Sequence, residues 1–124
     1  QLDSFLEIKR SNAELYRQLI SEIPQVDLAW EEPWAKSNFW LCTLLVPAAD
    51  RKPLMDHLLS ENIQVRPAWK LMHTLPMYQD CQKYRLEETE AVFEHCISIP
   101  SSVQLTEEEI RFVVKSIQTY FDQS

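Results

Sequence analysis

The most restrictive feature of this 124-residue sequence is that it contains no glycine. Average usage near 7% predicts roughly nine glycines in a chain of this length. Their absence excludes the loops that need glycine to bind phosphate, among them the dinucleotide-binding fingerprint and the Walker A loop. It also excludes the sharp serine turn of α/β hydrolases, so an autonomous hydrolase is disfavoured. We therefore expect any phosphate handled by the protein to be held mainly by residues outside this chain.

Composition and charge narrow the class of protein further. Hydrophobic residues make up 45% and charged residues 25% of the chain, which is ordinary for a globular domain, and the length fits one domain over residues 1–124. The net charge of −7 disfavours nucleic acid and anionic membrane surfaces as partners. No apolar run approaches the ~20 residues that span a bilayer. Gln1 is not an initiator methionine and residues 1–23 do not resemble a signal peptide, so we expect the chain to begin partway through a longer polypeptide.

The cysteines indicate the cellular compartment. Cys42, Cys81 and Cys96 are odd in number and widely spaced, which favours a reducing environment, and we expect a cytoplasmic protein. Together with His73 and His95 they lack the tight pairs that are typical of zinc sites. We therefore expect no metal site in this chain.

Hydrophobic periodicity predicts a helix at each end of the chain. Apolar residues recur three and four positions apart over residues 2–23, which predicts a long amphipathic helix stopped by Pro24. Thr106 followed by Glu109 is a capping box, and it predicts a final helix that carries apolar residues as far as Phe121.

The middle of the chain alternates shorter helices and strands. Asp50 is the expected N-cap of a helix that ends near Ser60, and residues 86–96 form a further helix. The best strand is residues 38–46, whose alternating faces are both largely apolar and so predict a strand covered on both sides. Shorter extended segments are expected at residues 26–30, 63–66 and 97–100, with loops at 31–37 and 68–77 and one or two helical turns at 78–84. The pattern predicts an α+β domain in which a small mixed or antiparallel sheet packs against helices.

Ordered motifs along nearly the whole chain resemble one enzyme family. They are Lys-Arg-Ser-Asn-Ala-Glu-Leu-Tyr at 9–16, Ser-Asn-Phe-Trp-Leu at 37–41, Arg-Pro-Ala-Trp-Lys-Leu-Met-His at 66–73, Leu-Pro-Met-Tyr at 75–78, Ile-Ser-Ile-Pro at 97–100 and Thr-Glu-Glu-Glu-Ile at 106–110. This set is similar to the C-terminal small domain of the DegT/DnrJ/EryC1/StrS family of sugar aminotransferases, which depend on pyridoxal phosphate. It most resembles members that aminate 4-keto nucleotide sugars.

The resemblance implies the small domain of the aspartate-aminotransferase-type fold, in a homodimer whose large domain is outside this chain. It implies transfer of an amino group from glutamate to a keto nucleotide sugar, for cell-surface polysaccharide or sugar biosynthesis, with pyridoxal phosphate as cofactor. In that family the lysine of the Schiff base lies in the large domain, and none of the six lysines here matches its motif. We expect no catalytic and no cofactor-binding residue in this chain, and no cofactor bound to it, so that alone it is inactive.

Six residues are implied to face the cleft between the domains as substrate contacts: Asn38, Trp40, Arg66, Trp69, Lys70 and His73. An arginine can form a paired contact with a carboxylate or phosphate, and a tryptophan offers a flat surface to a sugar or a base. A histidine supplies a donor that switches with pH.

Each of the six also has a structural explanation. Trp40 in mid-strand is more often a core residue, Arg66 can be a solvated surface arginine, and Asn38 can simply begin a strand. For Trp69 to His73, a loop without apolar periodicity favours function. The acidic runs at 87–90 and 107–109 lie near expected helix starts, where they complement the helix dipole.

Other functions remain open. Some relatives replace the Schiff-base lysine with histidine and dehydrate sugars, and the deciding residue lies outside this chain. A freestanding α+β binding or dimerisation module is the alternative from a different class. An exposed apolar patch at Leu2, Phe5 and Trp34 would fit a first helix that packs on the missing domain.

Overall fold

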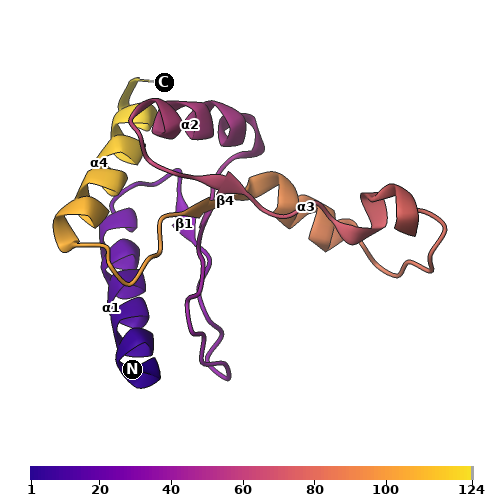
Figure 1. Cartoon of the computed structure of the whole chain (residues 1–124). Coiled ribbons are helices and arrows are strands. Elements are labelled where there is room, and N and C mark those ends of the chain that lie inside the picture. The colour runs from indigo at the N-terminus through magenta and orange to yellow at the C-terminus, as the bar shows by residue number, and fades with distance from the viewer. Residues whose placement is uncertain (124) are drawn as a thin grey trace.

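Helices pack against a four-stranded sheet in the computed structural model, which describes residues 1–123 (Figure 1). In chain order the elements are α1 (Leu2–Ile20), β1 (Asp27–Leu28), β2 (Cys42–Leu45), α2 (Ala48–Ser60), β3 (Arg66–Pro67), the 3₁₀ helices η1 (Met72–Thr74) and η2 (Pro76–Tyr78), α3 (Glu87–His95), β4 (Cys96–Ile99) and α4 (Glu107–Gln123). The expected α+β class is confirmed. No helix within residues 1–123 is long and apolar enough to cross a membrane.

The sheet has the strand order β1-β2-β4-β3, and every pair is antiparallel. β3 contains Pro67, which has no amide hydrogen to donate, and it lies at the sheet edge where such a residue is tolerated. Because side chains alternate across a strand, β2 and β4 each present one face to the helices and one away from them.

The core lies on the helix side of the sheet. Leu44 and Ile97, which face each other across β2 and β4, are fully buried together with Tyr16 of α1 and Ile117 of α4. Further buried members come from α1, α2 and α4, from the strands and from the loops: Ala13, Ile20, Ile23, Val26, Leu28, Phe39, Cys42, Val46, Leu54, Leu58, Ile63, Val65, Ile99, Ile110, Val113 and Val114. The capping box that opens α4 is confirmed, since the Thr106 and Glu109 side chains each accept the other's backbone N–H.

The expectation that the strand at 38–46 is covered on both sides is confirmed in full for one face only. On the second face, which we call the open face, Thr43, Leu45 and Ser98 are only half-buried. The strand is also shorter than expected, since the ladder begins at Cys42. Residues 38–41 form a turn instead, in which the Trp40 backbone bonds to the nearby Asn38 side chain and to the remote Lys9 and Ser101 side chains, as described below.

Three further expectations are corrected. Asp50 is not the N-cap of α2: Pro47 holds that position, and the Asp50 carboxylate accepts a hydrogen bond from Tyr120 at 3.0 Å. The strand expected at 63–66 is displaced to Arg66–Pro67. No helical turn continues beyond η2 across residues 79–84, whose side chains are all exposed and so gain nothing from packing as a helix.

The segment from η1 to the start of α3 projects away from the body of the molecule. It forms the salmon-coloured arm in Figure 1, here defined as residues 70–86. Large apolar side chains are exposed along it: Met72, Met77, Tyr78 and Tyr84. α3 joins the arm to β4.

Candidate functional site

Two of the predicted site residues meet. The indole rings of Trp40, just before β2, and Trp69, just after β3, lie 5.7 Å apart between centroids at an interplanar angle of 48°. Both side chains are exposed, Trp40 to 61% and Trp69 to 73%, so the interpretation of Trp40 as a core residue is wrong. Exposed aromatic faces of this kind are suited to a planar ring. We call this feature the tryptophan corner.

The turn that carries Trp40 is built by side chains that bond to the backbone. The Asn38 Oδ1 accepts the Trp40 N–H at 2.9 Å, and the Ser37 Oγ accepts the Phe39 N–H at 3.0 Å. Phe39 has φ of 45°, in the left-handed region that costs a residue with a Cβ about 1–2 kcal/mol. Its ring is buried against Trp30, with centroids 4.6 Å apart, so core packing holds the strained backbone. Asn38 therefore shapes the turn in addition to its predicted role as a substrate contact.

A network of charges fixes the start of this turn. The Glu31 carboxylate accepts two hydrogen bonds from Arg10, at 2.5 and 3.0 Å, and one from the Ser37 N–H at 2.5 Å. Arg10 also donates to the Ser37 carbonyl oxygen and lies over the Phe39 ring. The Arg10 guanidinium, and next the Ser37 N–H, lower the pKa of Glu31 to about 2. Glu31 therefore stays ionised, and the paired geometry of the guanidinium is retained.

Lys9 and Ser101 bond to the backbone of Trp40. The Lys9 ammonium donates to the Trp40 carbonyl oxygen at 3.0 Å and to the Ser101 carbonyl oxygen. The Ser101 hydroxyl donates to the same Trp40 oxygen at 2.9 Å. Sequence reasoning gave neither residue a site role, although Lys9 and Arg10 open the first motif of the family resemblance.

A polar row crosses the open face of the sheet beside the tryptophan corner. Thr43, Ser98 and Arg66 are direct partners across β2, β4 and β3, so their side chains lie on the same face. Arg66 and Lys70 are exposed, and within residues 1–123 neither side chain has a hydrogen-bond or ion-pair partner. Two unpaired cations beside an aromatic pair offer charge for an anionic group.

His73 is directed elsewhere. Its Nε2 lies 2.9 Å from Oε1 of Glu90 on α3, and the histidine side chain is only 15% exposed. The pair joins the arm to α3. Of the six predicted residues, the structure thus brings Asn38, Trp40 and Trp69 together, with Arg66 and Lys70 close to Trp69 in the chain, and places His73 against α3.

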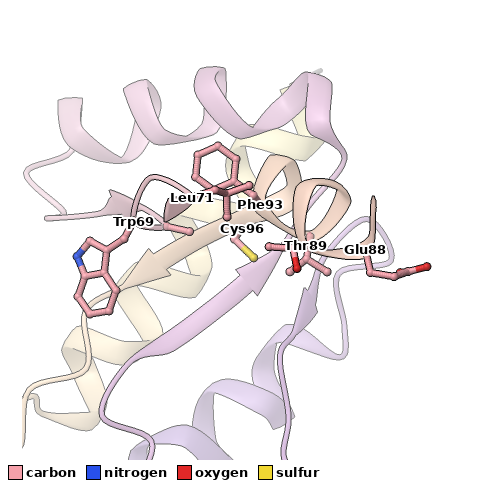
Figure 2. A pocket seen from close by; sticks show the side chains of 8 residues that line it. Trp69, Leu71, Glu88, Thr89, Phe93 and Cys96 are labelled. Atoms are coloured by element: carbon pink, nitrogen blue, oxygen red, sulfur yellow. The ribbon is translucent and has the colours of Figure 1, made fainter. Parts of the chain in front are cut away.

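An apolar hollow lies between Trp69 and α3. It has a volume of about 360 Å³ and is lined by Ala68, Trp69, Leu71, Glu88, Thr89, Val92, Phe93 and Cys96. Figure 2 shows the Cys96 side chain rising from β4 between Phe93 and Thr89, with the Trp69 indole at the far end. Burial raises the pKa of the Cys96 thiol, which disfavours the reactive thiolate form.

The residues of this chain do not fit a Schiff-base site for pyridoxal phosphate. A lysine that forms a Schiff base is usually desolvated so that it can lose its proton, whereas five of the six lysines are exposed. The sixth, Lys9, is engaged by two carbonyl oxygens. Among residues 1–123 there is also no group of three His, Cys, Asp or Glu side chains placed to hold a metal ion.

Comparison with known proteins identifies the family. GDP-perosamine synthase of Escherichia coli O157:H7 is 28% identical over 123 residues, which is 98% of this chain and 33% of that protein. EpsN of Bacillus subtilis strain 168, provisionally assigned as a pyridoxal phosphate-dependent aminotransferase, is 30% identical over 97% of this chain and 32% of its own length. The chain thus spans about a third of these curated relatives.

Solved structures show the same fold. The sugar aminotransferase CalS13 from Micromonospora echinospora superposes with a TM-score of 0.85 at 24% identity, over 96% of this chain and 31% of that one. The aminotransferase TlmJ from Streptoalloteichus hindustanus also gives 0.85, at 16% identity over 95% of this chain and 32% of that one. The model of the DegT/DnrJ/EryC1/StrS aminotransferase family matches residues 1–118, and the chain belongs to that family.

Proposed function

We propose that this chain is the C-terminal small domain of a cytoplasmic, homodimeric aminotransferase that depends on pyridoxal phosphate. The enzyme transfers an amino group from glutamate to a keto nucleotide sugar, for cell-surface polysaccharide or related sugar biosynthesis. Family membership over residues 1–118 supports the reaction class. The names of the relatives support the substrate class, since one makes GDP-perosamine and CalS13 is a sugar aminotransferase.

The observation that carries the proposal on this chain is the tryptophan corner beside unpaired cations. A nucleotide sugar combines a planar base, a charged diphosphate and a polar ring. Trp40 and Trp69 offer faces for the base or the sugar ring, and Arg66 and Lys70 offer charge for the diphosphate. This pairing of surfaces matches the substrate better than it matches a small amino acid.

Of the remaining predicted residues, Asn38 completes the binding surface. Asn38 holds the turn through its Oδ1, which leaves its amide nitrogen to donate to a sugar hydroxyl. His73 bonds to Glu90 through Nε2 and lies against α3, so its predicted substrate contact is left out of this binding surface. Through these contacts the chain binds and orients the substrate and excludes water from it.

Pyridoxal phosphate supplies the electron sink of transamination, and the rest of the enzyme supplies the lysine and the phosphate contacts. Because the lysines here do not fit that role, the 124-residue chain by itself is expected to bind no cofactor and to have no transaminase activity. A family member that dehydrates its sugar would use the same small domain, so the test below measures both reactions.

The test is a kinetic comparison in the complete enzyme that carries this sequence, with glutamate and a 4-keto nucleotide sugar. Trp69→Ala is expected to raise KM for the sugar about tenfold, because loss of a base–aromatic stack costs roughly 1–3 kcal/mol, while KM for glutamate is unchanged. Phe112→Ala is the matched control, since Phe112 is an exposed aromatic residue on α4, outside the tryptophan corner. Dehydration of the sugar without amino transfer would show that the enzyme is a dehydratase. Equal effects of the two substitutions on KM for the sugar would show that the tryptophan corner is not part of the binding site.

A further inference from the structure

Three chain segments that are distant in the sequence converge on one backbone oxygen. The Trp40 carbonyl accepts from Lys9 of α1, 31 residues earlier, and from the Ser101 hydroxyl, 61 residues later. The Lys9 ammonium also donates to the Ser101 carbonyl oxygen, which closes a triangle of hydrogen bonds. We call these three contacts the Lys9 clamp.

The clamp lies where the sheet ladder does not reach. The ladder between β2 and β4 begins at the pair Cys42 and Ile99, so the Trp40 carbonyl has no strand partner to set its direction. Ser101 follows β4 by two residues, and Lys9 reaches across from the helix layer. The clamp therefore fixes the peptide that follows Trp40, and with the Asn38 contact to the Trp40 N–H it constrains this residue from both sides.

The choice of side chain is informative. Lys9 is half-buried, and within residues 1–123 its ammonium bonds only to neutral carbonyl oxygens and has no carboxylate partner. Ordering a lysine side chain costs up to about 2 kcal/mol of conformational entropy, so closing a loop with a lysine carries a large entropic cost. The loop also contains the strained Phe39, and strain of this kind persists where the surrounding structure over-determines it.

We propose that Lys9 and Ser101 are positioning residues that hold the Trp40 indole against Trp69 and so set the geometry of the tryptophan corner. The geometric part stands on the contacts alone. Only the consequence for substrate binding rests on the proposed function.

The geometry can be measured without activity. Two indoles at a centroid separation of 5.7 Å couple their electronic transitions and give a paired band of opposite signs in the circular dichroism spectrum. In the complete enzyme, the band of this pair is the part of the circular dichroism spectrum that disappears in both Trp40→Phe and Trp69→Phe. The same part remains in Trp34→Phe. Lys9→Met is expected to lose most of this band while helix content is unchanged, and Lys9→Arg is expected to restore much of it. Lys52→Met, at an exposed lysine paired only within α2, is the control and is expected to keep the band.

Ser101→Ala keeps the proposal testable if Lys9→Met fails to fold, since it removes only one of the three contacts. A band of full amplitude in Lys9→Met would overturn the proposal, and if Lys9→Met does not fold, a band of full amplitude in Ser101→Ala would overturn it. In an active enzyme, Lys9→Met is also expected to raise KM for the sugar and to leave kcat and KM for the amino donor unchanged. A lost band in an enzyme that does not act on keto sugars would support the positioning role and contradict only the proposed function.

Discussion

At the scale of single residues, residues other than glycine adopt the left-handed backbone conformation. Within residues 1–123, Phe39, Asn62 and Arg85 have positive φ of 45°, 62° and 49°. Asn62 ends α2 in a Schellman motif, in which Ile63 N–H donates to Leu58 at 2.9 Å and Asn62 N–H donates to Leu59 at 3.1 Å. Asparagine tolerates this geometry best after glycine, whereas Phe39 is held in it by burial and by the turn around it.

Asn62 gives the first prediction at this scale. Asn62→Gly is expected to stabilise the chain by about 0.5 kcal/mol, and Asn62→Val to destabilise it by about 1–2 kcal/mol, because a β-branched residue is penalised in the left-handed region. Urea denaturation of the 124-residue chain measures both changes. A valine tolerated without loss would show that the end of α2 is not held in this conformation.

Glu31 gives a prediction for pH. Its pKa is lowered from an ordinary value of 4.5 to about 2 by Arg10, so the stability it contributes is present above pH 4.5 and is lost as the pH falls toward 2. In Glu31→Gln, the free energy of unfolding is therefore expected to fall less than in the wild type as the pH decreases from 4.5 toward 2. The urea midpoint measured from pH 6 to pH 2 checks it, with Asp56→Asn, in an exposed pair with Lys52, as the control. Identical pH profiles for the wild type and Glu31→Gln would contradict the assignment.

At the scale of elements, local signals predicted the helices well and the strands in part: β1 and β4 lie at the segments expected at 26–30 and 97–100, whereas β2 and β3 begin later than expected. α1 and α4 lie where periodicity and the capping box place them, because the spacing of apolar residues and the cap are both properties of neighbouring residues. The stretch at 38–41 is as apolar as a strand, yet Lys9 and Ser101 capture its backbone from remote positions. A contact across 31 or 61 residues leaves no periodic trace in the sequence.

The capping box gives the prediction for an element. Thr106→Ala is expected to destabilise the chain by about 1 kcal/mol, because the Glu109 N–H loses the hydroxyl that accepts it. Thr119→Ala, in the same helix but away from the cap, is the control. Both are measured by urea denaturation, and a cost for Thr119→Ala equal to that of Thr106→Ala would rule out a specific role of the cap.

At the scale of the whole molecule, strand order brings the candidate site together. β4, formed by residues 96–99, lies between β2 and β3, and Trp40, just before β2, meets Trp69, just after β3. Motif resemblance singled out both tryptophans, but their contact depends on a sheet topology that the sequence pattern does not specify. His73 was singled out in the same way, and its partner Glu90 was interpreted only as a helix-dipole residue.

The apolar surface also belongs to this scale. Leu2, Phe5 and Trp34 are exposed as expected, and the arm adds further exposed apolar side chains. Surfaces of this kind usually mark contacts with other protein. In the proposed enzyme the large domain or the second subunit covers them, in keeping with relatives about three times as long.

The central claim is that this chain is one domain of an aminotransferase that depends on pyridoxal phosphate. It is tested most directly by the mass and absorption spectrum of the native polypeptide that carries the sequence, before and after borohydride reduction. An enzyme of this kind has a polypeptide roughly three times as long as this chain, since a separate large domain is required. The account predicts a pyridoxal phosphate absorption band that reduction removes by fixing the cofactor to a lysine. A colourless native polypeptide of only this length, with no affinity for pyridoxal phosphate, would contradict it.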